Sequence, residues 1–229
     1  MCVLVLYVGL DPATPLLVGA NRDEALDRPS APPAEVEPGI VAGRDLVAGG
    51  TWLGLNTSGL FVAITNRRRP ARSPEARSRG LLALEALRCR TLEEVEELAA
   101  RRVAEGPIAG FNLVAVAGTA GVCIHWDGAL RPARFGPGRH IVTTDRDLDD
   151  PHMDERRPFD RVEHRPPSLE ELKELLRSHE GERPVCKHGE RFGTVSSAIY
   201  VRSPREKLLL YAAGPPCTTP FADLSGVLP

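Results

Sequence analysis

Short apolar segments separated by turn residues run along most of this chain, and this pattern limits the possible folds more than any other feature. Residues 3–9 are apolar and partly β-branched, and residues 16–20 repeat this pattern after a turn that contains two prolines. Such short links join antiparallel strands, because parallel neighbours need a crossover of a dozen or more residues. The sequence therefore predicts β-hairpins rather than βαβ units.

The remaining elements follow the same logic and predict an α+β fold. Residues 28–50 contain many Pro and Gly residues and are expected to form an ordered loop with short extended pieces, and 67–78 is a second predicted loop. Further strands are predicted at 51–55, 60–65, 111–117, 122–126, 140–144, 196–201 and 207–212, and helices at 78–89 and after the capping boxes that begin at Thr91 and Ser168. We expect two mainly antiparallel sheets covered by helices, in one domain over residues 1–229.

Composition and the chain ends exclude several classes of protein. The chain has 29 Lys and Arg residues against 31 Asp and Glu residues, and this balance argues against a nucleic-acid partner. The amino terminus lacks the basic region and cleavage site of a signal peptide, and no apolar run approaches the ~18 residues of a membrane span. The five cysteines are widely spaced, without a C-x-x-C pair. We expect a cytoplasmic protein with reduced thiols and no stable membrane insertion.

Cys2 is the first candidate for chemistry. An initiator methionine is normally removed when a small residue follows, so we expect the mature chain to begin with this cysteine. One residue would then carry a thiol and an α-amine, with ordinary pKa values of about 8.5 and about 7.7–8.0. The neutral amine can accept the thiol proton, which places a nucleophile and its base on one residue. The alternative is that Cys2 is a small apolar residue at the start of a strand.

The second candidate is Asn21-Arg22-Asp23-Glu24, which directly follows the second predicted strand. In a hairpin the end of the second strand lies beside the start of the first, so Arg22 and Asp23 are expected close to Cys2. A carboxylate can hold the α-amine, and an arginine can lower the pKa of the thiol. Asn21 is a candidate for substrate contact. The alternative is a solvated turn.

The third candidate combines Gly49-Gly50-Thr51-Trp52-Leu53-Gly54 with the strand that ends at Asn66. Glycines allow the backbone to approach a ligand, Trp52 can line a pocket, and the amide of Asn66 is suited to an oxyanion. Arg67, the first of three successive arginines, can contact an anionic substrate. The alternatives are that Trp52 belongs to the core, that Asn66 forms a turn and that the arginines are an exposed charge run.

These pieces belong to a longer series of motifs that covers nearly the whole chain. The series consists of Met1-Cys2 followed by an apolar strand, Ala20-Asn21-Arg22-Asp23-Glu24, Gly49-Gly50-Thr51-Trp52-Leu53-Gly54, Gly59-Leu60 to Thr65-Asn66, Gly110-Phe111-Asn112-Leu113, and Phe192-Gly193-Thr194-Val195-Ser196-Ser197. In content and order, the series resembles the NRDE family, also called the transport and Golgi organization 2 family. That family is similar to N-terminal-nucleophile (Ntn) cysteine hydrolases of the bile-salt hydrolase and penicillin V acylase type.

The resemblance implies a four-layer αββα sandwich and the hydrolysis of a non-peptide C–N amide bond in a small acylated substrate. It implies that Cys2 attacks the carbonyl, that Asp23, in the loop after the second strand, braces the amine and thiol, and that Asn66 stabilises the oxyanion. This chain departs from the pattern at Ala20, where the acylases carry an arginine. It departs again at Thr144, whose hydroxyl stands near the position of a second oxyanion asparagine.

An amidohydrolase is the favoured hypothesis, and a non-catalytic carrier or chaperone of haem or an acyl or lipid ligand remains the alternative. Eukaryotic members of the family are linked to haem and lipid handling, which favours the carrier. No cofactor is expected, and a homo-oligomer remains possible. No metal site is expected either, because Cys186 and His188 form the only close pair of metal-ligand type. Asp145–Asp150 lacks the glycine and final glutamate of a calcium loop.

Overall fold

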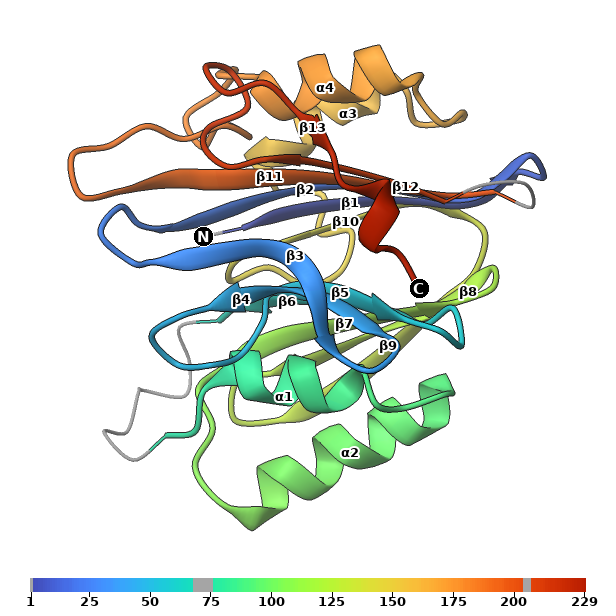
Figure 1. Cartoon of the computed structure of the whole chain (residues 1–229), viewed down its shortest axis with the longest axis vertical. Coiled ribbons are helices and arrows are strands. Elements are labelled where there is room, and N and C mark those ends of the chain that lie inside the picture. Colours follow the sequence, from blue (N-terminus) through green and yellow to red (C-terminus); the bar gives the residue numbers. More distant parts are fainter. Residues whose placement is uncertain (1, 68–75, 204–206) are drawn as a thin grey trace. The chain divides into compact units, whose positions relative to one another are not determined.

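The computed structural model describes residues 2–67, 76–203 and 207–229 (Figure 1). Met1 and most of the loop predicted at 67–78 therefore lie outside the described residues. The contacts within the chain define two units. The first unit takes in the chain up to Asp27 and again Gly136–Leu228, and the second consists of Arg28–Phe135 with Pro229. No helix in the described parts of the chain is long and apolar enough to cross a membrane.

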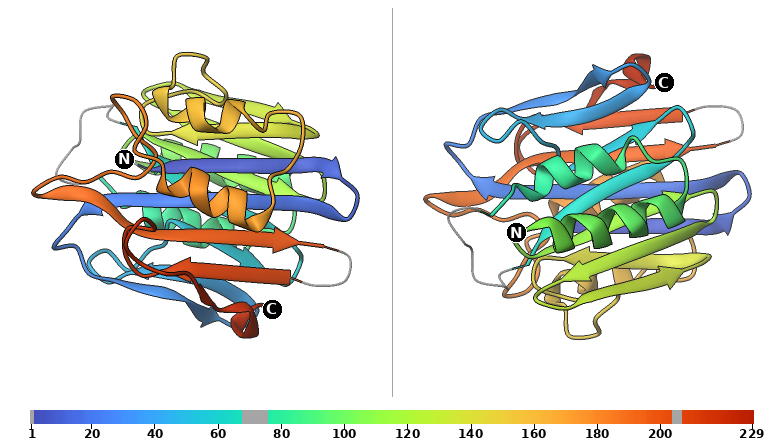
Figure 2. Two further views of the ribbon diagram at one scale, coloured as in Figure 1. Left: turned by 90° about the horizontal axis from the view of Figure 1, so that it is seen from above. Right: turned by 90° about the horizontal axis from the view of Figure 1, so that it is seen from below.

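The first unit is a six-stranded antiparallel sheet with the strand order β10-β1-β2-β11-β12-β13. Its strands are β1 (Val3–Asp11), β2 (Thr14–Ala25), β10 (Gly138–Thr143), β11 (Phe192–Arg202), β12 (Lys207–Ala212) and β13 (Ala222–Asp223). Its helical segments are η1 (Asp154–Arg156), α3 (Arg157–Asp160), α4 (Leu169–Arg177) and η2 (Ser225–Val227). Helices α3 and α4 lie across one face of the sheet (Figure 2).

Strand alternation explains how this face is covered. Val3 and Val5 project from β1 toward the helices and share a buried core with Leu172 and Leu176 of α4 and Phe159 of α3. The same alternation continues along β2, so alternate side chains of β2 also face the helices. Asn21, which directly follows the apolar part of β2, is thereby held beside α4.

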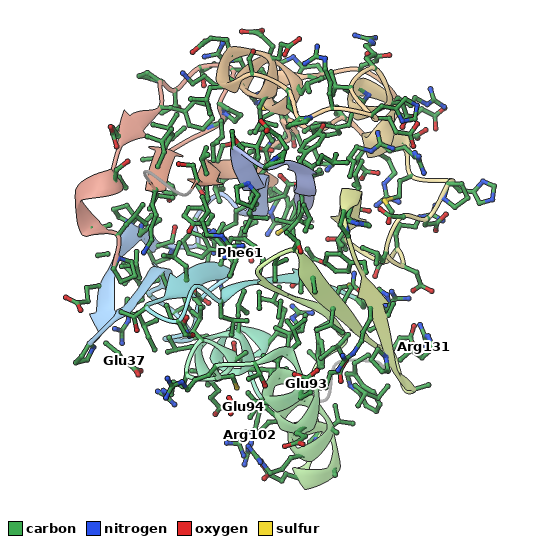
Figure 3. The ribbon with its side chains drawn as sticks, turned by 90° about the vertical axis from the view of Figure 1, so that its right-hand side faces the viewer. Glu37, Phe61, Glu93, Glu94, Arg102 and Arg131 are labelled. Atoms are coloured by element: carbon green, nitrogen blue, oxygen red, sulfur yellow. The ribbon has the colours of Figure 1, made fainter. Side chains whose placement is uncertain are left out.

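The second unit is a seven-stranded antiparallel sheet with the strand order β3-β4-β5-β6-β7-β8-β9. Its strands are β3 (Ser30–Glu37), β4 (Ile40–Asp45), β5 (Leu53–Asn56), β6 (Phe61–Asn66), β7 (Phe111–Ala117), β8 (Ala120–Trp126) and β9 (Leu130–Phe135). Helices α1 (Arg79–Ala86) and α2 (Leu92–Glu105) lie across one face (Figure 2). Helix α2 buries Leu92, Val95 and Leu98 and turns Glu93 and Glu94 toward solvent (Figure 3).

The α+β class with two antiparallel sheets is confirmed, but strand β9 was not predicted and two further details of the prediction are wrong. Residues 28–50 are not a loop, because most of them form β3 and β4. Strand β3 tolerates Pro32 and Pro33 because it is the edge strand and its pairing is interrupted between Ala31 and Ala34. Asp23 is not in a loop after the second strand, because β2 runs on to Ala25 and pairs with β11.

The capping box of α4 gives a direct test of the local structure. Ser168 Oγ accepts a hydrogen bond from the Glu171 amide at 3.3 Å, and the Glu171 carboxylate accepts one from the Ser168 amide at 2.8 Å. We expect Ser168→Ala to lower the free energy of unfolding by about 1 kcal/mol in urea denaturation, whereas Ser168→Thr keeps most of it. Equal stability of the alanine variant and the natural protein would contradict this assignment.

Candidate functional site

Cys2 lies immediately before β1, between the end of β10 and the second half of β2. Val3 pairs with Thr143 on one side and with Asn21 on the other, so the next residues outward are Thr144 and Arg22. The backbone N–H of Cys2 donates a hydrogen bond to Thr144 Oγ1 at 2.9 Å. Thr144 is buried, whereas Cys2 is only partly buried. Thus the nitrogen that would become the α-amine after loss of Met1 already has a fixed partner.

The environment of the Cys2 thiol keeps its proton in place. Burial raises the pKa of the thiol, and the nearby negative charge of Asp23 raises it further. A hydrogen bond from the Asp23 backbone and the positive charge of Arg22 lower the pKa, but they do not cancel the effect of burial. This thiol therefore needs a base before it can act as a nucleophile at neutral pH.

Asp23 is fully buried and held from two sides. Its carboxylate accepts a hydrogen bond from Thr194 Oγ1 at 2.7 Å and one from Lys187 Nζ at 3.0 Å. Thr194 faces Asp23 across the β2–β11 pair, beside an irregularity in the register of β11. Burial raises the pKa of Asp23, whereas Lys187 and Thr194 oppose this rise. The lysine supplies the counter-charge that allows a carboxylate to ionise at this depth.

Lys187 is also part of a larger buried charge cluster. Its ammonium lies 3.7 Å from the carboxylate of Glu155, and Arg183 approaches the same carboxylate at 3.4 Å. Only 1% of the Glu155 side chain is exposed. Sequence reasoning missed Lys187, Thr194 and Glu155 as site residues. Two weak signals existed, because Thr194 belongs to a family motif and Lys187 is one of only three lysines in the chain.

Arg22 and Asn21 project to opposite faces of β2, although both were predicted near the site. Arg22 is buried, and its charge lowers the pKa of both the Cys2 thiol and the Tyr211 phenol. Asn21 Nδ2 donates hydrogen bonds to the carbonyls of Leu176 at 2.9 Å and Val185 at 3.0 Å. The Asn21 amide thus ties β2 to the end of α4 and to the segment that leads to Lys187.

In the second unit, Asn66 and Arg67 lie at the end of β6 next to a buried polar network. Arg67 donates to Asn112 Oδ1 at 3.0 Å and forms an ion pair with Asp127 at 2.8 Å. Asn112 is fully buried and also lies 2.7 Å from His125 Nδ1. Asn66 is half-buried. The other two residues of the predicted arginine run lie outside the described residues.

Trp52 and its neighbouring glycines have a clear structural use in the same unit. A Cβ atom on Gly43 would lie 2.5 Å from the Trp52 indole, so this ring packs directly on the backbone of β4. A Cβ on Gly50 would lie 2.2 Å from the carbonyl carbon of Gly80, and Thr51 N–H donates to Gly80 O at 3.0 Å. These close approaches fix the loop before β5 against the start of α1.

Solved structures identify the class of fold. The chain is similar to the Caenorhabditis elegans N-acylethanolamine-hydrolyzing acid amidase ortholog, with a TM-score of 0.56 and 12% identity over 88% of this chain and 92% of that one. It is also similar to the C2A mutant of the conjugated bile acid hydrolase of Clostridium perfringens, with a TM-score of 0.56 and 10% identity over 97% of this chain and 96% of that one. The fold is that of the N-terminal-nucleophile hydrolases.

The chain belongs to the Transport and Golgi organisation 2 family, whose model matches residues 1–204. A mouse (Mus musculus) homolog of that name is 40% identical over 93 residues, which cover 36% of this chain and 33% of the relative. The bovine (Bos taurus) homolog is 32% identical over 160 residues, 61% of this chain and 55% of the relative. The matched stretches thus span about a third to about half of these relatives' length. The predicted family is confirmed.

A double-mutant cycle tests the buried pair of Asp23 and Lys187. Lys187→Met leaves the Asp23 carboxylate buried without its nearest counter-charge, so we expect the free energy of unfolding to fall by about 3–5 kcal/mol at pH 8. Adding Asp23→Asn to this variant removes the stranded charge and should restore part of the loss. Urea denaturation of the single and double variants measures both values.

The loss in Lys187→Met should also depend on pH with a defined sign. Burial already raises the pKa of Asp23, and removal of the lysine raises it further. In the folded Lys187→Met variant, the Asp23 carboxyl then keeps a proton that it releases in the unfolded chain. The free energy of unfolding of the variant is therefore highest below the usual aspartate pKa and falls as the pH rises above it. A pH-independent loss, or a double variant less stable than Lys187→Met, would contradict this assignment.

Proposed function

We propose that this protein is an N-terminal cysteine nucleophile hydrolase that cleaves the C–N amide bond of a small acylated substrate once Met1 has been removed. The observation that carries the proposal is the 2.9 Å hydrogen bond from the Cys2 nitrogen to Thr144 Oγ1, next to the buried Asp23. The names of the two structural neighbours support the class of bond, since both neighbours are described as hydrolysing acyl amides or conjugates.

The chemistry needs only the residue itself and one water molecule. Without Met1, the Cys2 nitrogen is an α-amine with an ordinary pKa of about 7.7–8.0, so roughly a tenth of it is neutral at pH 7 and about half near pH 8. It accepts the thiol proton, and the thiolate forms a bond to the amide carbonyl carbon. The ammonium then returns this proton to the departing amine as the C–N bond breaks, which leaves a thioester. Water, deprotonated by the same amine, releases the acid and restores the thiol.

The neighbouring residues orient and stabilise these species. We assign to Thr144 the orientation of the amine, whose lone pair must point at the Cys2 sulfur. The Asp23 backbone and the charge of Arg22 favour the thiolate, because each of them lowers the pKa of the thiol. Asn66 belongs to the second unit, and its role as an oxyanion donor rests on the family resemblance alone.

A non-catalytic carrier of haem or an acyl or lipid ligand is the second candidate. The raised pKa of the Cys2 thiol favours this candidate, because a protonated thiol binds an apolar acid without attacking it. The two candidates differ in what Cys2 does to its ligand. The enzyme forms a covalent acyl intermediate on Cys2, whereas the carrier releases its ligand unchanged.

Replacement of Cys2 separates these candidates. With the mature protein and a panel of N-acylethanolamines and bile-acid conjugates, we expect Cys2→Ala to lower kcat by at least about 10³-fold, because the nucleophile is lost. Cys89→Ser is the matched control, since Cys89 is a partly buried free cysteine of the second unit. Its activity should be unchanged.

Mass spectrometry completes this test, because it shows whether Met1 has been removed and whether Cys2 carries an acyl group. Intact mass should show that Met1 is absent, and a quenched reaction should show the acyl group on Cys2. Hydrolysis that persists in Cys2→Ala, or a natural protein that retains Met1, would contradict the enzyme. Unchanged binding of an acyl ligand by Cys2→Ala, without turnover by the natural protein, would support the carrier.

A further inference from the structure

Four side chains of metal-ligand type meet in the first unit, on segments that are separate in the sequence. His179 follows α4, Cys186 and His188 lie between α4 and β11, and Cys217 follows β12. One ligand atom from each residue lies within 4.8 Å of the corresponding atoms of the other three. This four-ligand cluster is distinct from the Cys2 site and does not depend on the proposed function.

Four of the six distances between the ligand atoms are close to those of a tetrahedron, and the two from His179 to the sulfur atoms are within 4.8 Å. The two sulfur atoms are 3.6 Å apart, the Nε2 atoms of His179 and His188 are 3.2 Å apart, and His188 Nε2 lies 3.1 Å from Cys217 Sγ and 3.8 Å from Cys186 Sγ. Tetrahedral zinc, with Zn–S near 2.3 Å and Zn–N near 2.0–2.1 Å, requires about 3.8 Å between sulfurs, about 3.4 Å between nitrogens and about 3.6 Å between sulfur and nitrogen. All four distances agree with these values to within roughly half an ångström.

A disulfide bond does not explain why the four side chains converge. It requires a sulfur separation of about 2.05 Å, and Cys186 and Cys217 are both free. The two imidazoles meet edge to face, with ring centroids 5.1 Å apart and their Nε2 atoms 3.2 Å apart. Two imidazole nitrogens and two thiols that converge on one point form the donor set of a structural zinc site.

The backbone already holds the segments that carry these ligands. The Cys186 amide donates to Ser178 O at 2.9 Å, which closes the loop that leads from His179 to Cys186. Beyond the ligands, the Thr194 amide donates to Lys187 O at 2.9 Å. On the opposite side, Arg177 donates to Pro216 O at 3.0 Å and fixes the residue before Cys217. The ligands are therefore presented by main chain that is ordered by its own hydrogen bonds.

We propose that His179, Cys186, His188 and Cys217 bind one Zn²⁺ ion in a structural site. Four protein ligands fill a tetrahedral shell and leave no position for a substrate, which is typical of structural rather than catalytic zinc. The two thiols lose their protons when the ion binds. Local spacing in the sequence does not indicate this site, because Cys217 lies 31 residues after Cys186.

The site has a consequence for its surroundings. Lys187 stands between two of the ligands, and its ammonium pairs with Asp23 at 3.0 Å. Bound zinc would fix the main chain on both sides of this lysine. The ion would also link the end of α4 to the segment after β12. In the described residues, hydrogen bonds such as that from Arg177 to Pro216 O already connect these two segments.

Metal analysis of the purified full-length protein, prepared under reducing conditions, tests the proposal. Inductively coupled plasma mass spectrometry should find about one equivalent of zinc per chain. When Co²⁺ replaces the zinc, the absorption spectrum should show the d–d bands and the thiolate-to-cobalt charge-transfer bands of a tetrahedral site. Competition with a zinc-chelating dye should show that Cys217→Ser and His179→Gln each weaken zinc binding by more than about 100-fold, since each removes a ligand.

Two matched controls make the result specific. Cys89→Ser removes a partly buried thiol of the second unit, and His164→Gln removes an exposed imidazole outside the cluster. Both variants should bind zinc like the natural protein. His179 is exposed, so its variant is informative even if a cysteine variant fails to fold. Absence of zinc and cobalt binding, ligand variants that bind normally, or a Cys186–Cys217 disulfide that persists under the reducing conditions would each overturn the proposal.

Discussion

The pairing of β1 with β10 on one side and β2 on the other determines the chemistry that the first unit can offer. Val3 faces both Thr143 and Asn21, so the residue before it must lie between Thr144 and Arg22. A shift of either pair by one residue would turn every side chain of β1 to the opposite face, which the buried core of Val3 and Val5 forbids. Ordinary hydrophobic packing thus sets the position of Cys2.

The polar residues around Cys2 depend on burial as much as on position. The carboxylates of Asp23 and Glu155 are buried at a depth where an unpaired charge is costly, and the positive charges of Lys187 and of the partly exposed Arg183 lie beside them. Burial raises the pKa of both the Cys2 thiol and Asp23, and the positive charge of Lys187 restrains the latter. A thiol in such surroundings gains reactivity only when a base lies next to it. The nitrogen of Cys2, which is hydrogen-bonded to Thr144, is the base that we propose.

Features that depend on local patterns were predictable from the sequence. The hairpin of β1 and β2, the capping box at Ser168, the α+β class and the family follow from apolar runs, capping residues and ordered motifs. Thr91 is the predicted N-cap of α2, but its capping box is incomplete, because the Glu94 carboxylate accepts from the Arg90 amide. Proximity of Cys2 to Arg22 also followed, because hairpin register is a local property. The strands in 28–50 were missed because Pro32 and Pro33 resemble loop residues, although an edge strand accepts them.

Features that depend on distant segments were not predictable in this way. Lys187 reaches Asp23 across 164 residues of sequence, and Thr194 reaches it across 171. The four-ligand cluster likewise forms only when the segment after β12 returns to the end of α4. Polar runs such as Asn21–Glu24 resemble turns, yet here the run extends a central strand, and buried partners bind the amide nitrogen of Asn21 and the carboxylate of Asp23.

The pH dependence of Cys2 alkylation most directly tests whether a free Cys2 amine activates the thiol. The comparison pairs the mature chain with a variant that carries an extra Gln between Met1 and Cys2 and so retains its methionine. We expect the mature chain to react with an apparent pKa near the ordinary α-amine value of about 7.7–8.0. The variant should react only at higher pH, because burial raises the thiol pKa. Identical profiles for the two chains would contradict a role for the amine.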